Sequence, residues 1–454
     1  MKGRIISLAF ILLGVQLIFA QESKTIELSL QKCVQLAVEN NINVRTARID
    51  KEKGTAKKDE AKAGLYPKIN MSASMTDNVA LPTTLLPEAF GALAGTPGKA
   101  VAVQMGSNYS STAMLSISQV IYNQTALTAL KLAKKADEIN ELGIQKSKEE
   151  IGIQVAKMYM LALTTLEQQK LIESNIERAE RLKKITQVTV DNGVGKQIDL
   201  DRINVSLENT YNQLSNTKAA QEQQMNTIKY LLDMTLDTQI HLTDTVGTEL
   251  LNNKPVLIND FSSNVNVRML ESQQQVYSLN KKFINAGYLP SLSVSGQAAY
   301  QGLQNKFSTY FSSNSDNKWF PYANFTVTLS VPVFDGFEKR SKAHQAEMDT
   351  KKTELTLNNT KEALSLDYRN ALNTYTNNKT NVSRQKQNLQ LAEKVYMETS
   401  LRYKEGVATM SSLLQDETGL DNAQASYLTA LYNFKDSELK IMSLNGEINR
   451  LIQK

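Results

Sequence analysis

Two long tracts without proline most constrain the fold of this 454-residue chain. They cover 98–254 and 333–454, and the eight prolines stand at positions 67, 82, 87, 97, 255, 290, 321 and 332. Because a proline inside a helix costs about 3 kcal/mol or more, these tracts are where long helices can form. We predict one helix over 124–191 and another over 337–404, each roughly 100 Å long at about 1.5 Å per residue. Helices of this length do not fit a compact globule.

The pattern inside the first tract is that of a coiled coil. Over 151–179, apolar residues recur at alternating steps of four and three, and Thr165 and Gln169 are the two polar members of this seam. Charged and amide residues fill the flanking faces, which indicates helices that pack along one stripe. After each long helix a glycine turn precedes a second predicted helix, over 198–232 and 411–450.

Four short segments alternate instead with a period of two, which predicts strands with one apolar and one small polar face. In the clearest segment, Phe325, Val327 and Leu329 alternate with Thr326 and Thr328. Each segment is close to the ~9–11 residues that a tilted membrane strand needs. A soluble β-sandwich would alternate as well, but the long helices offer it no second sheet. The predicted strands are 68–76, 112–122, 290–301 and 322–334, and the outer loops between them are 77–111 and 302–321.

The two halves of the chain resemble each other in register. Asn-Val-Arg occurs at 43–45 and again at 266–268, an offset of 223 residues. With the same offset, Ala-Gly-x-x-Pro ends at Pro67 and at Pro290, where each half begins its first strand. Ordered agreement at several places indicates an internal repeat rather than chance.

Later matches need a shorter offset. Val-Ile-Tyr-Asn at 120–123 aligns with Pro332 and the three residues after it at an offset of 212. The first outer loop is therefore longer than the second, and it holds the extra residues. Prolines at such strand–helix junctions stop ladder pairing and redirect the chain. We therefore divide the chain into a first repeat at 21–232, a linker at 233–262 and a second repeat at 263–454.

Four strands in one chain cannot close a barrel, because the open edges would leave unpaired backbone groups in lipid. Copies of the chain must therefore associate. Two copies would give eight strands with a filled interior, and three would give twelve strands around a wider lumen. In either case the apolar face would contact lipid and the Ser/Thr face would line water.

The first twenty residues have the pattern of a secretory signal peptide. Lys2 and Arg4 precede an apolar run over 5–19, and Ala20 offers a small residue at a cleavage point. The run of about fifteen residues is short for a spanning helix, although an N-terminal membrane anchor is the alternative. We expect a signal peptide at 1–20 and an exported chain, in which no later stretch has the ~18 apolar residues of a transmembrane helix.

Composition excludes most kinds of chemistry. One cysteine and two histidines supply neither a disulfide framework nor the clustered ligands of a structural zinc site. The net charge of +5 is spread along the chain rather than gathered in the basic patch of a nucleic-acid binder. An exported hydrolase would need a nucleophile, a base and an acid together, and the sequence offers no such cluster. We therefore expect no catalytic residue, no metal site, no cofactor and no nucleic-acid partner.

Several motifs in a fixed order carry a resemblance to a known family. They are Leu28-Ser29-Leu30 with Ala37, the two Ala-Gly-x-x-Pro segments, the strand exits at 119–123 and 332–336, and Arg402-Tyr403-x-x-Gly406 followed by Leu413-Leu414. With these motifs the chain resembles the TolC family of outer-membrane efflux proteins. The resemblance implies an α+β membrane protein and a homotrimer. Its twelve-stranded β-barrel, with four strands per chain, would continue into a long periplasmic α-helical barrel, with 233–262 in an equatorial region.

The resemblance also implies a location and partners. The trimer would lie in outer-membrane lipid of a Gram-negative bacterium and dock onto a periplasmic adaptor (membrane fusion) protein and an inner-membrane transporter. Our leading hypothesis is a passive exit duct of a tripartite efflux or type I secretion system. The alternative is an exported coiled-coil scaffold or adhesin without a pore, which would explain the heptads but not the alternating strands.

By the same resemblance, the two helix-hairpin tips are expected to contact the adaptor. A plain glycine turn that ends a helix is the alternative interpretation of these segments. The expected contact residues are Gly193, Val194 and Gly195 in the first tip and Gly406, Val407 and Ala408 in the second.

Asp199 and Tyr403 match positions that hold the periplasmic gate closed in the family, and Asp201 could add negative charge there. Acids exposed at a helix start are the alternative interpretation of the two aspartates. The sequence also departs from the family pattern. Ala408 replaces a gate arginine of some members, and Ser412 and Gln415 stand where they have inward acids.

Overall fold

The computed structural model describes residues 25–90, 95, 97–247, 260–312, 318–448, 450 and 451. The predicted signal peptide at 1–20 lies outside these residues, and so do residues 248–259 of the predicted linker. Within the described part of the chain, no helix combines the length and the apolarity that crossing a membrane requires.

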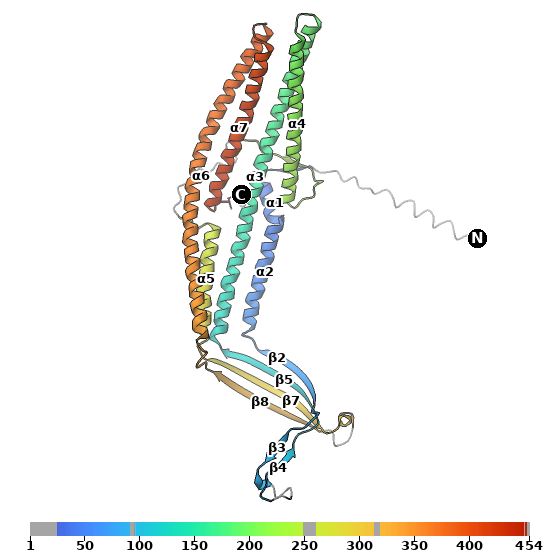
Figure 1. Cartoon of the computed structure of the whole chain (residues 1–454), viewed down its shortest axis with the longest axis vertical. Coiled ribbons are helices and arrows are strands. Elements are labelled where there is room, and N and C mark those ends of the chain that lie inside the picture. The colour runs from blue at the N-terminus through green and yellow to red at the C-terminus, as the bar shows by residue number, and fades with distance from the viewer. Residues whose placement is uncertain are drawn as a thin grey trace, which may run out of the picture. The chain divides into compact units, whose positions relative to one another are not determined.

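Long helices dominate the described chain (Figure 1). In chain order the helices are α1 (Leu30–Asn40), α2 (Ile42–Ala63), α3 (Gln124–Asp191), α4 (Gln197–Leu231), α5 (Val265–Ala286), α6 (Glu338–Lys404) and α7 (Met410–Leu444). The strands are β1 (Ile26–Leu28), β2 (Lys68–Asp77), β3 (Thr83–Leu86), β4 (Val101–Gln104), β5 (Tyr109–Tyr122), β6 (Ile240–Leu242), β7 (Ser291–Gln304) and β8 (Trp319–Ser330). A short 3-10 helix, η2, covers Phe307–Phe311.

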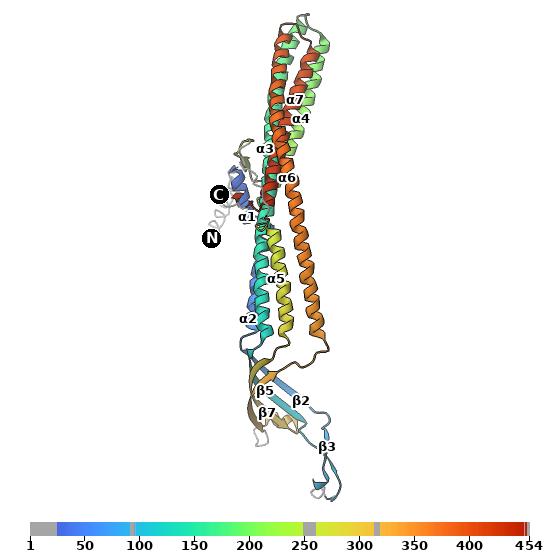
Figure 2. The same cartoon turned by 90° about the vertical axis from the view of Figure 1, so that its left-hand side faces the viewer.

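The chain forms two compact units, and each takes segments from both halves of the sequence. The helical unit comprises Met1–Lys51, Asn140–Glu271 and Leu355–Lys454, and the sheet unit comprises Glu52–Ile139 and Ser272–Glu354. The long helices α3 and α6 contribute to both units. In the helical unit, α3, α4, α6 and α7 lie side by side, as both views show (Figure 1, Figure 2). The two sequence repeats are therefore interleaved in space.

The sheet unit contains a four-stranded antiparallel sheet in the order β2-β5-β7-β8. Two of its strands are longer than the sequence pattern predicted. β5 begins at Tyr109 rather than at 112, and β7 continues to Gln304 rather than 301. The cause is mutual pairing, because Tyr109 is the partner of Gln304 at the end of the β5–β7 ladder. The alternating pattern alone underestimates the length of a strand whose ends are set by pairing with a neighbouring strand.

The predicted limits of the last strand were wrong at both ends. β8 begins at Trp319 rather than 322 and ends at Ser330 rather than 334, although Val331 and Val333 continue the alternation. The last pair of the β7–β8 ladder joins Ser291 to Ser330. Pro290 precedes it and has no N–H to donate, so the ladder cannot continue past this pair.

The outer loops contain more structure than the sequence pattern predicted. Within 77–111, β3 pairs with β4 in an antiparallel hairpin, from Thr83 with Gln104 to Leu86 with Val101. Within 302–321, the helix η2 follows β7, and β8 has already begun at the end of the segment. Short strands of two to four pairs leave too weak a periodic pattern to be found from sequence.

The long helices begin and end close to the predicted limits, with one correction. α7 ends at Leu444, six residues before 450, because Gly446 adopts a left-handed φ of 70°. A Cβ at this glycine would lie 2.9 Å from the carbonyl oxygen of Ser263, so no other residue fits there. Before β2, the chain leaves the helical conformation at Asn41, with φ −56° and ψ 136°, and this residue separates α1 from α2. Its side-chain Oδ1 accepts the N–H of Asn43 at 2.9 Å and so begins α2.

The core of the helical unit lies where α1, α3 and the short parallel pair β1–β6 meet. Cys33 and Tyr159 are completely buried there. The Tyr159 hydroxyl donates to the Leu28 carbonyl at 2.9 Å and lies 2.8 Å from a carboxylate oxygen of Asp244. That carboxylate also accepts the N–H of Leu30 at 2.7 Å, so it fixes the start of α1 against α3.

Candidate functional site

The four-stranded sheet has two chemically different faces. Its register places Ile69, Ile117, Gly296 and Phe325 in one row across the strands. The neighbouring row points to the opposite face, because successive side chains of a strand alternate. That row consists of Asn70, Ser116, Gln297 and Asn324. One face is therefore apolar and the other carries small polar side chains.

The apolar face is not covered by any other part of the described chain. Met71 is 78% exposed and Phe325 is 71% exposed, values unusual for apolar side chains of a soluble sheet. The strands β2 and β8 are the two edges of the sheet, so each has a partner on one side only within the described residues. An edge strand of ten or more residues with free backbone groups needs a partner before it can lie in lipid.

Aromatic rings gather at the outer end of the sheet. Trp319 stacks on Tyr300 with ring centroids 5.8 Å apart, and Tyr310 of η2 tilts against Trp319 at 6.0 Å. Gly302 lies beneath the indole, where an added Cβ would be 3.0 Å from a ring atom. Rings of this kind are typical of the interface between a membrane strand and water.

The predicted junction prolines lie at strand ends. Pro67 comes directly before β2, and Pro290 comes directly before β7. Pro332 lies two residues after β8 ends at Ser330. A proline at each of these places leaves no backbone donor where the ladder stops.

The two hairpin tips have the same backbone geometry. In the first, Gly193 has a φ of 71°, and the N–H groups of Val194 and Gly195 both bond to the carbonyl of Thr189, at 3.1 and 2.9 Å. A left-handed residue of this kind is a common helix ending. A Cβ at Gly195 would lie 2.8 Å from the backbone nitrogen of Val190.

The second tip repeats this arrangement 213 residues later. Gly406 has a φ of 73°, and the N–H groups of Val407 and Ala408 bond to the carbonyl of Arg402 at 2.9 and 3.1 Å. Val194 and Val407 are 81% and 73% exposed, so each tip presents one apolar side chain to solvent. The glycine geometry alone fits a plain helix ending; the matched exposed valines are the additional feature.

The predicted gate aspartates are bound within their own helix. Asp199, in the first turn of α4, forms an ion pair with Arg202 at 3.1 Å. Asp201 accepts a hydrogen bond from the Gln197 amide at 2.9 Å. In the described structure no hydrogen bond joins Asp199 to Tyr403. The closing role of these residues therefore stays a prediction.

Tyr403 lies elsewhere, in an apolar tip cluster that joins the two hairpins. Its buried members are Ile203 of α4 and Met410 and Leu413 of α7. Ser412, one of the departures from the family pattern, contributes to the start of α7, because its N–H donates to the Thr409 hydroxyl at 3.2 Å. The sequence comparison pointed to Tyr403, but the partners that it contacts were not predicted.

A second link between the hairpins is polar and was missed from the sequence. We call it the polar cluster; its residues are Asn175 and Arg178 of α3, Tyr396 of α6, and Glu417, Asp421 and Gln424 of α7. The Asn175 amide donates to Asp421 and, at 3.4 Å, to Gln424. The Arg178 guanidinium donates to the Asn175 side-chain oxygen and lies 5.5 Å from the centre of the Tyr396 ring.

Burial and charge together control the ionisation of the polar cluster. Burial, reinforced by the Asp421 carboxyl and opposed by Arg178, raises the pKa of Glu417 to about 7. Burial also raises the pKa of Asp421, against the effects of Arg178 and Asn175. The Nε of Arg178 is buried and has no hydrogen-bond partner in the structure. Two carboxyls thus share one cation, so a proton on Glu417 neutralises the excess negative charge.

The sequence did carry a signal for the polar cluster. Glu417, Asp421 and Gln424 follow steps of four and three along α7, the same spacing that marks an apolar seam. A polar stripe at seam spacing that continues an apolar one, here Leu413 and Leu420, indicates buried polar residues. In the described part of the chain, no three His, Cys, Asp or Glu residues gather in a way that could hold a metal ion.

These features define a class of protein: an outer-membrane channel subunit, with a short two-faced sheet and long helical hairpins. The model of the family described as outer membrane efflux protein matches residues 33–232 and 262–447. The chain belongs to this outer membrane efflux protein family. It is a protein of the outer membrane with a large periplasmic helical part.

Solved structures of similar proteins share the fold. The open state of the MtrE outer membrane channel of Neisseria gonorrhoeae aligns with a TM-score of 0.74 and 16% identity over 94% of this chain and 91% of that one. VceC of Vibrio cholerae aligns with a TM-score of 0.69 and 13% identity over 92% of this chain and 96% of that one. The CmeC channel of Campylobacter jejuni aligns with a TM-score of 0.68 and 16% identity over 92% of this chain and 86% of that one. No curated protein sequence matches the chain.

Proposed function

We propose that this efflux protein is the passive exit duct of a tripartite efflux or type I secretion system and acts as a homotrimer. The single observation that carries the proposal is the sheet, with its exposed apolar face, its small polar face and its two unpartnered edges. Three copies of four strands would pair every edge and close a barrel wide enough for a lumen. The polar face would then line water and the apolar face would contact lipid.

The helical hairpins would continue this duct into the periplasm, and their tips would meet an adaptor. Two exposed valines in equivalent turns support this role, because small apolar residues at the end of a rigid hairpin allow a partner helix to approach closely. The adaptor would connect the duct to an inner-membrane transporter that supplies the energy. We infer a conduit rather than an enzyme, since a wall of strands and helices needs no catalytic group.

Opening of the tip would require the hairpins α3–α4 and α6–α7 to separate. Two contacts oppose this movement: the apolar tip cluster around Tyr403 and the polar cluster around Arg178. Both join residues of different hairpins, so each would have to break or rearrange when the duct opens. In this proposal the apolar tip cluster holds the hairpins together by packing, and the polar cluster holds them by hydrogen bonds and charge.

Particle mass and conductance test the proposal together. Protein extracted from outer membranes in mild detergent should have the mass of three chains by light scattering, and it should conduct ions in a planar bilayer. Because a closed tip would also suppress current, the recording includes the Tyr403→Ala variant. Recovery of the wild type as a soluble monomer from the periplasmic fraction would reject the duct.

A further inference from the structure

The two strand–helix passages of the repeated halves are not alike. In the first half β5 ends at Tyr122 and α3 begins at Gln124, with a single residue between them. In the second half β8 ends at Ser330 and α6 begins only at Glu338, so residues 331–337 form an extra passage. The duplication is therefore broken at this place, in the sheet unit.

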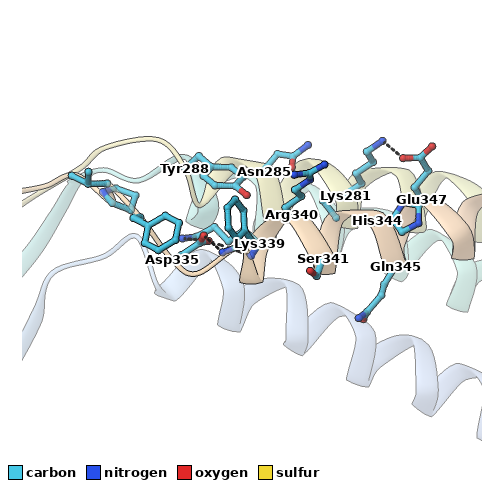
Figure 3. A pocket seen from close by; sticks show the side chains of 15 residues that line it. Lys281, Asn285, Tyr288, Asp335, Lys339, Arg340, Ser341, His344, Gln345 and Glu347 are labelled. Atoms are coloured by element: carbon cyan, nitrogen blue, oxygen red, sulfur yellow. Dashed lines mark hydrogen bonds and ion pairs between the residues drawn. The ribbon is translucent and has the colours of Figure 1, made fainter.

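This passage, the end of α5 and the start of α6 line an open cavity of about 1050 Å³ (Figure 3). Lys281 and Tyr288 come from the α5 side, Phe334 comes from the passage, and Arg340 and His344 come from α6. All of the lining residues belong to the sheet unit. The cavity is thus walled by cations and by aromatic rings.

Asp335 gives the passage a fixed shape. Its carboxylate accepts the N–H of Phe337 and the N–H of Lys339, both at 3.2 Å, and the Lys339 ammonium at 3.1 Å. Gly336 and Phe337 both adopt left-handed conformations, with φ of 65° and 67°. A large aromatic residue rarely tolerates such a φ, and strain of this kind gathers at functional sites.

The strained turn directs apolar side chains outward. The rings of Phe334 and Phe337 meet edge to face at 5.4 Å, and they are 75% and 59% exposed. Val333 beside them is 94% exposed. We call these three residues the apolar lip. They lie a few residues after Ser330, where the β7–β8 ladder ends.

The cations of the cavity are not balanced by its acids. Lys281 pairs with Glu347 at 3.0 Å, and Lys339 pairs with Asp335, so both carboxylates in the wall are engaged (Figure 3). Lys339 also lies 5.3 Å from the centre of the Tyr288 ring.

Arg340 and His344 stand one helical turn apart on α6, and neither side chain forms a hydrogen bond or ion pair among the described residues. The nearby Glu338 is bound to Lys342 and does not neutralise them. An uncompensated cation beside a second donor is arranged to receive an anion.

We propose that this cavity binds an anionic phospholipid of the periplasmic leaflet of the outer membrane. The phosphate would bind the guanidinium of Arg340 and the imidazole of His344, and an acyl chain would lie along the apolar lip. Arginine suits this role because its planar donors match two oxygens of a phosphate. The depth also fits, since the apolar strand face ends here and the long periplasmic helices begin.

A second copy of the chain is the competing occupant, and charge argues against it. If copies associate through β2 and β8, the neighbouring helix at this place would be α2 of the next copy. That helix carries seven Lys or Arg residues and four Asp or Glu residues, so it is itself basic. A basic helix does not complement a cationic wall, whereas an anionic headgroup does.

Native mass spectrometry of the full-length, delipidated protein tests the proposal by titration with phosphatidylglycerol and with zwitterionic phosphatidylcholine. We expect phosphatidylglycerol to bind preferentially, and Arg340→Ala to weaken it about tenfold, the effect of one charge-assisted contact. Arg340→Lys, which keeps the charge, should bind with intermediate affinity. Arg384→Ala is the matched control, because Arg384 is exposed on the same helix outside the sheet unit, and it should bind as the wild type does.

Four results of these titrations would overturn the proposal. They are equal binding of the two lipids, an unchanged affinity in Arg340→Ala, the same loss in Arg384→Ala, and displacement of the lipid by an equal concentration of inorganic phosphate. The last would identify an ion site without a role for the acyl chain. Dissociation of the oligomer by Arg340→Glu with lipid affinity unchanged would assign the cavity to a second copy instead.

Discussion

Asn41 and Asn264, 223 residues apart in sequence, make the same pair of hydrogen bonds. The side-chain oxygen of Asn41 accepts the N–H of Asn43 at 2.9 Å, and its amide donates to the carbonyl of Leu231 at 3.0 Å. Asn264 accepts the N–H of Asn266 at 3.0 Å and donates to the carbonyl of Leu444 at 3.4 Å. Each asparagine thus begins one helix and holds the end of another, so the internal repeat is present in the contacts as well as in the sequence.

Replacing Asn41 should destabilise the helical unit. Asn41→Ala removes a helix cap and leaves the Leu231 carbonyl without its donor, which should cost roughly 1–3 kcal/mol. Asn41→Asp keeps the capping oxygen but loses the amide donor, so its effect should be smaller. The midpoint of thermal unfolding, followed by circular dichroism in detergent, measures both. Equal midpoints for Asn41→Ala and the wild type would show that neither hydrogen bond contributes to stability.

Features that depend on local sequence were predicted well. The limits of α3, Gln124 and Asp191, coincide with the prediction, because a tract without proline and with a regular seam specifies a helix by itself. The two-faced strands were predicted for the same reason, since alternation fixes which side chains share a face.

Features that depend on a neighbouring strand or helix were not predicted from the sequence. The alternation of Val331 and Val333 continues that of β8, yet the strand stops at Ser330 because Pro290, directly before the neighbouring β7, cannot pair. Likewise the spacing of Glu417 and Asp421 along α7 marks a polar stripe, but the helix that packs against this stripe is not predicted. In the structure α3 contacts it, with Glu417 buried and Asp421 half-buried. Burial of this kind depends on which helices meet, and a single sequence does not state that.

The exposed valines should matter for partner binding rather than for folding. Val407→Asp places a charge at the centre of the expected adaptor contact, and affinity should fall about tenfold or more. Val194→Asp should act in the same direction, because its tip has the same geometry. Surface plasmon resonance with the purified adaptor gives the affinities. Val205→Asp is a matched control, since Val205 is 63% exposed on α4 away from the tip turn. If all three variants bind alike, the tips are not the contact.

Tyr403 should contribute more to closure of the tip than Asp199 does. Tyr403→Ala removes a ring from the apolar tip cluster between the hairpins, a loss of about 2 kcal/mol of packing that favours the open state. Asp199→Asn breaks an ion pair within α4 only, so its effect on closure should be small. Conductance in planar bilayers should therefore rise clearly in the first variant. Tyr230→Ala, an exposed tyrosine at the far end of α4, is the control. A larger rise in Asp199→Asn would show that its charge closes the tip directly.

Proton binding to Glu417 should hold the hairpins together. Burial and the Asp421 carboxyl raise the pKa of Glu417 to about 7 against the opposing effect of Arg178, from 4.5 for a free side chain. The folded protein therefore keeps this proton over a range in which the unfolded chain loses it. The stabilisation that this proton gives to the polar cluster is complete below about pH 4.5. It is lost as the pH rises through about 7, and the loss is at most about 3 kcal/mol.

Glu417→Gln should abolish this pH dependence, because the amide has the shape of the protonated acid and no charge to gain. Spin labels at Asn192 and Glu405, equivalent exposed positions in the two tips, report the separation of the hairpins. In the wild type the distance distribution should broaden between about pH 5 and about pH 8, and in Glu417→Gln it should stay narrow. Glu393→Gln, at an exposed position of α6, is the matched control and should behave as the wild type. The same broadening in Glu417→Gln would locate the titrating group elsewhere and leave the polar cluster with a structural role only.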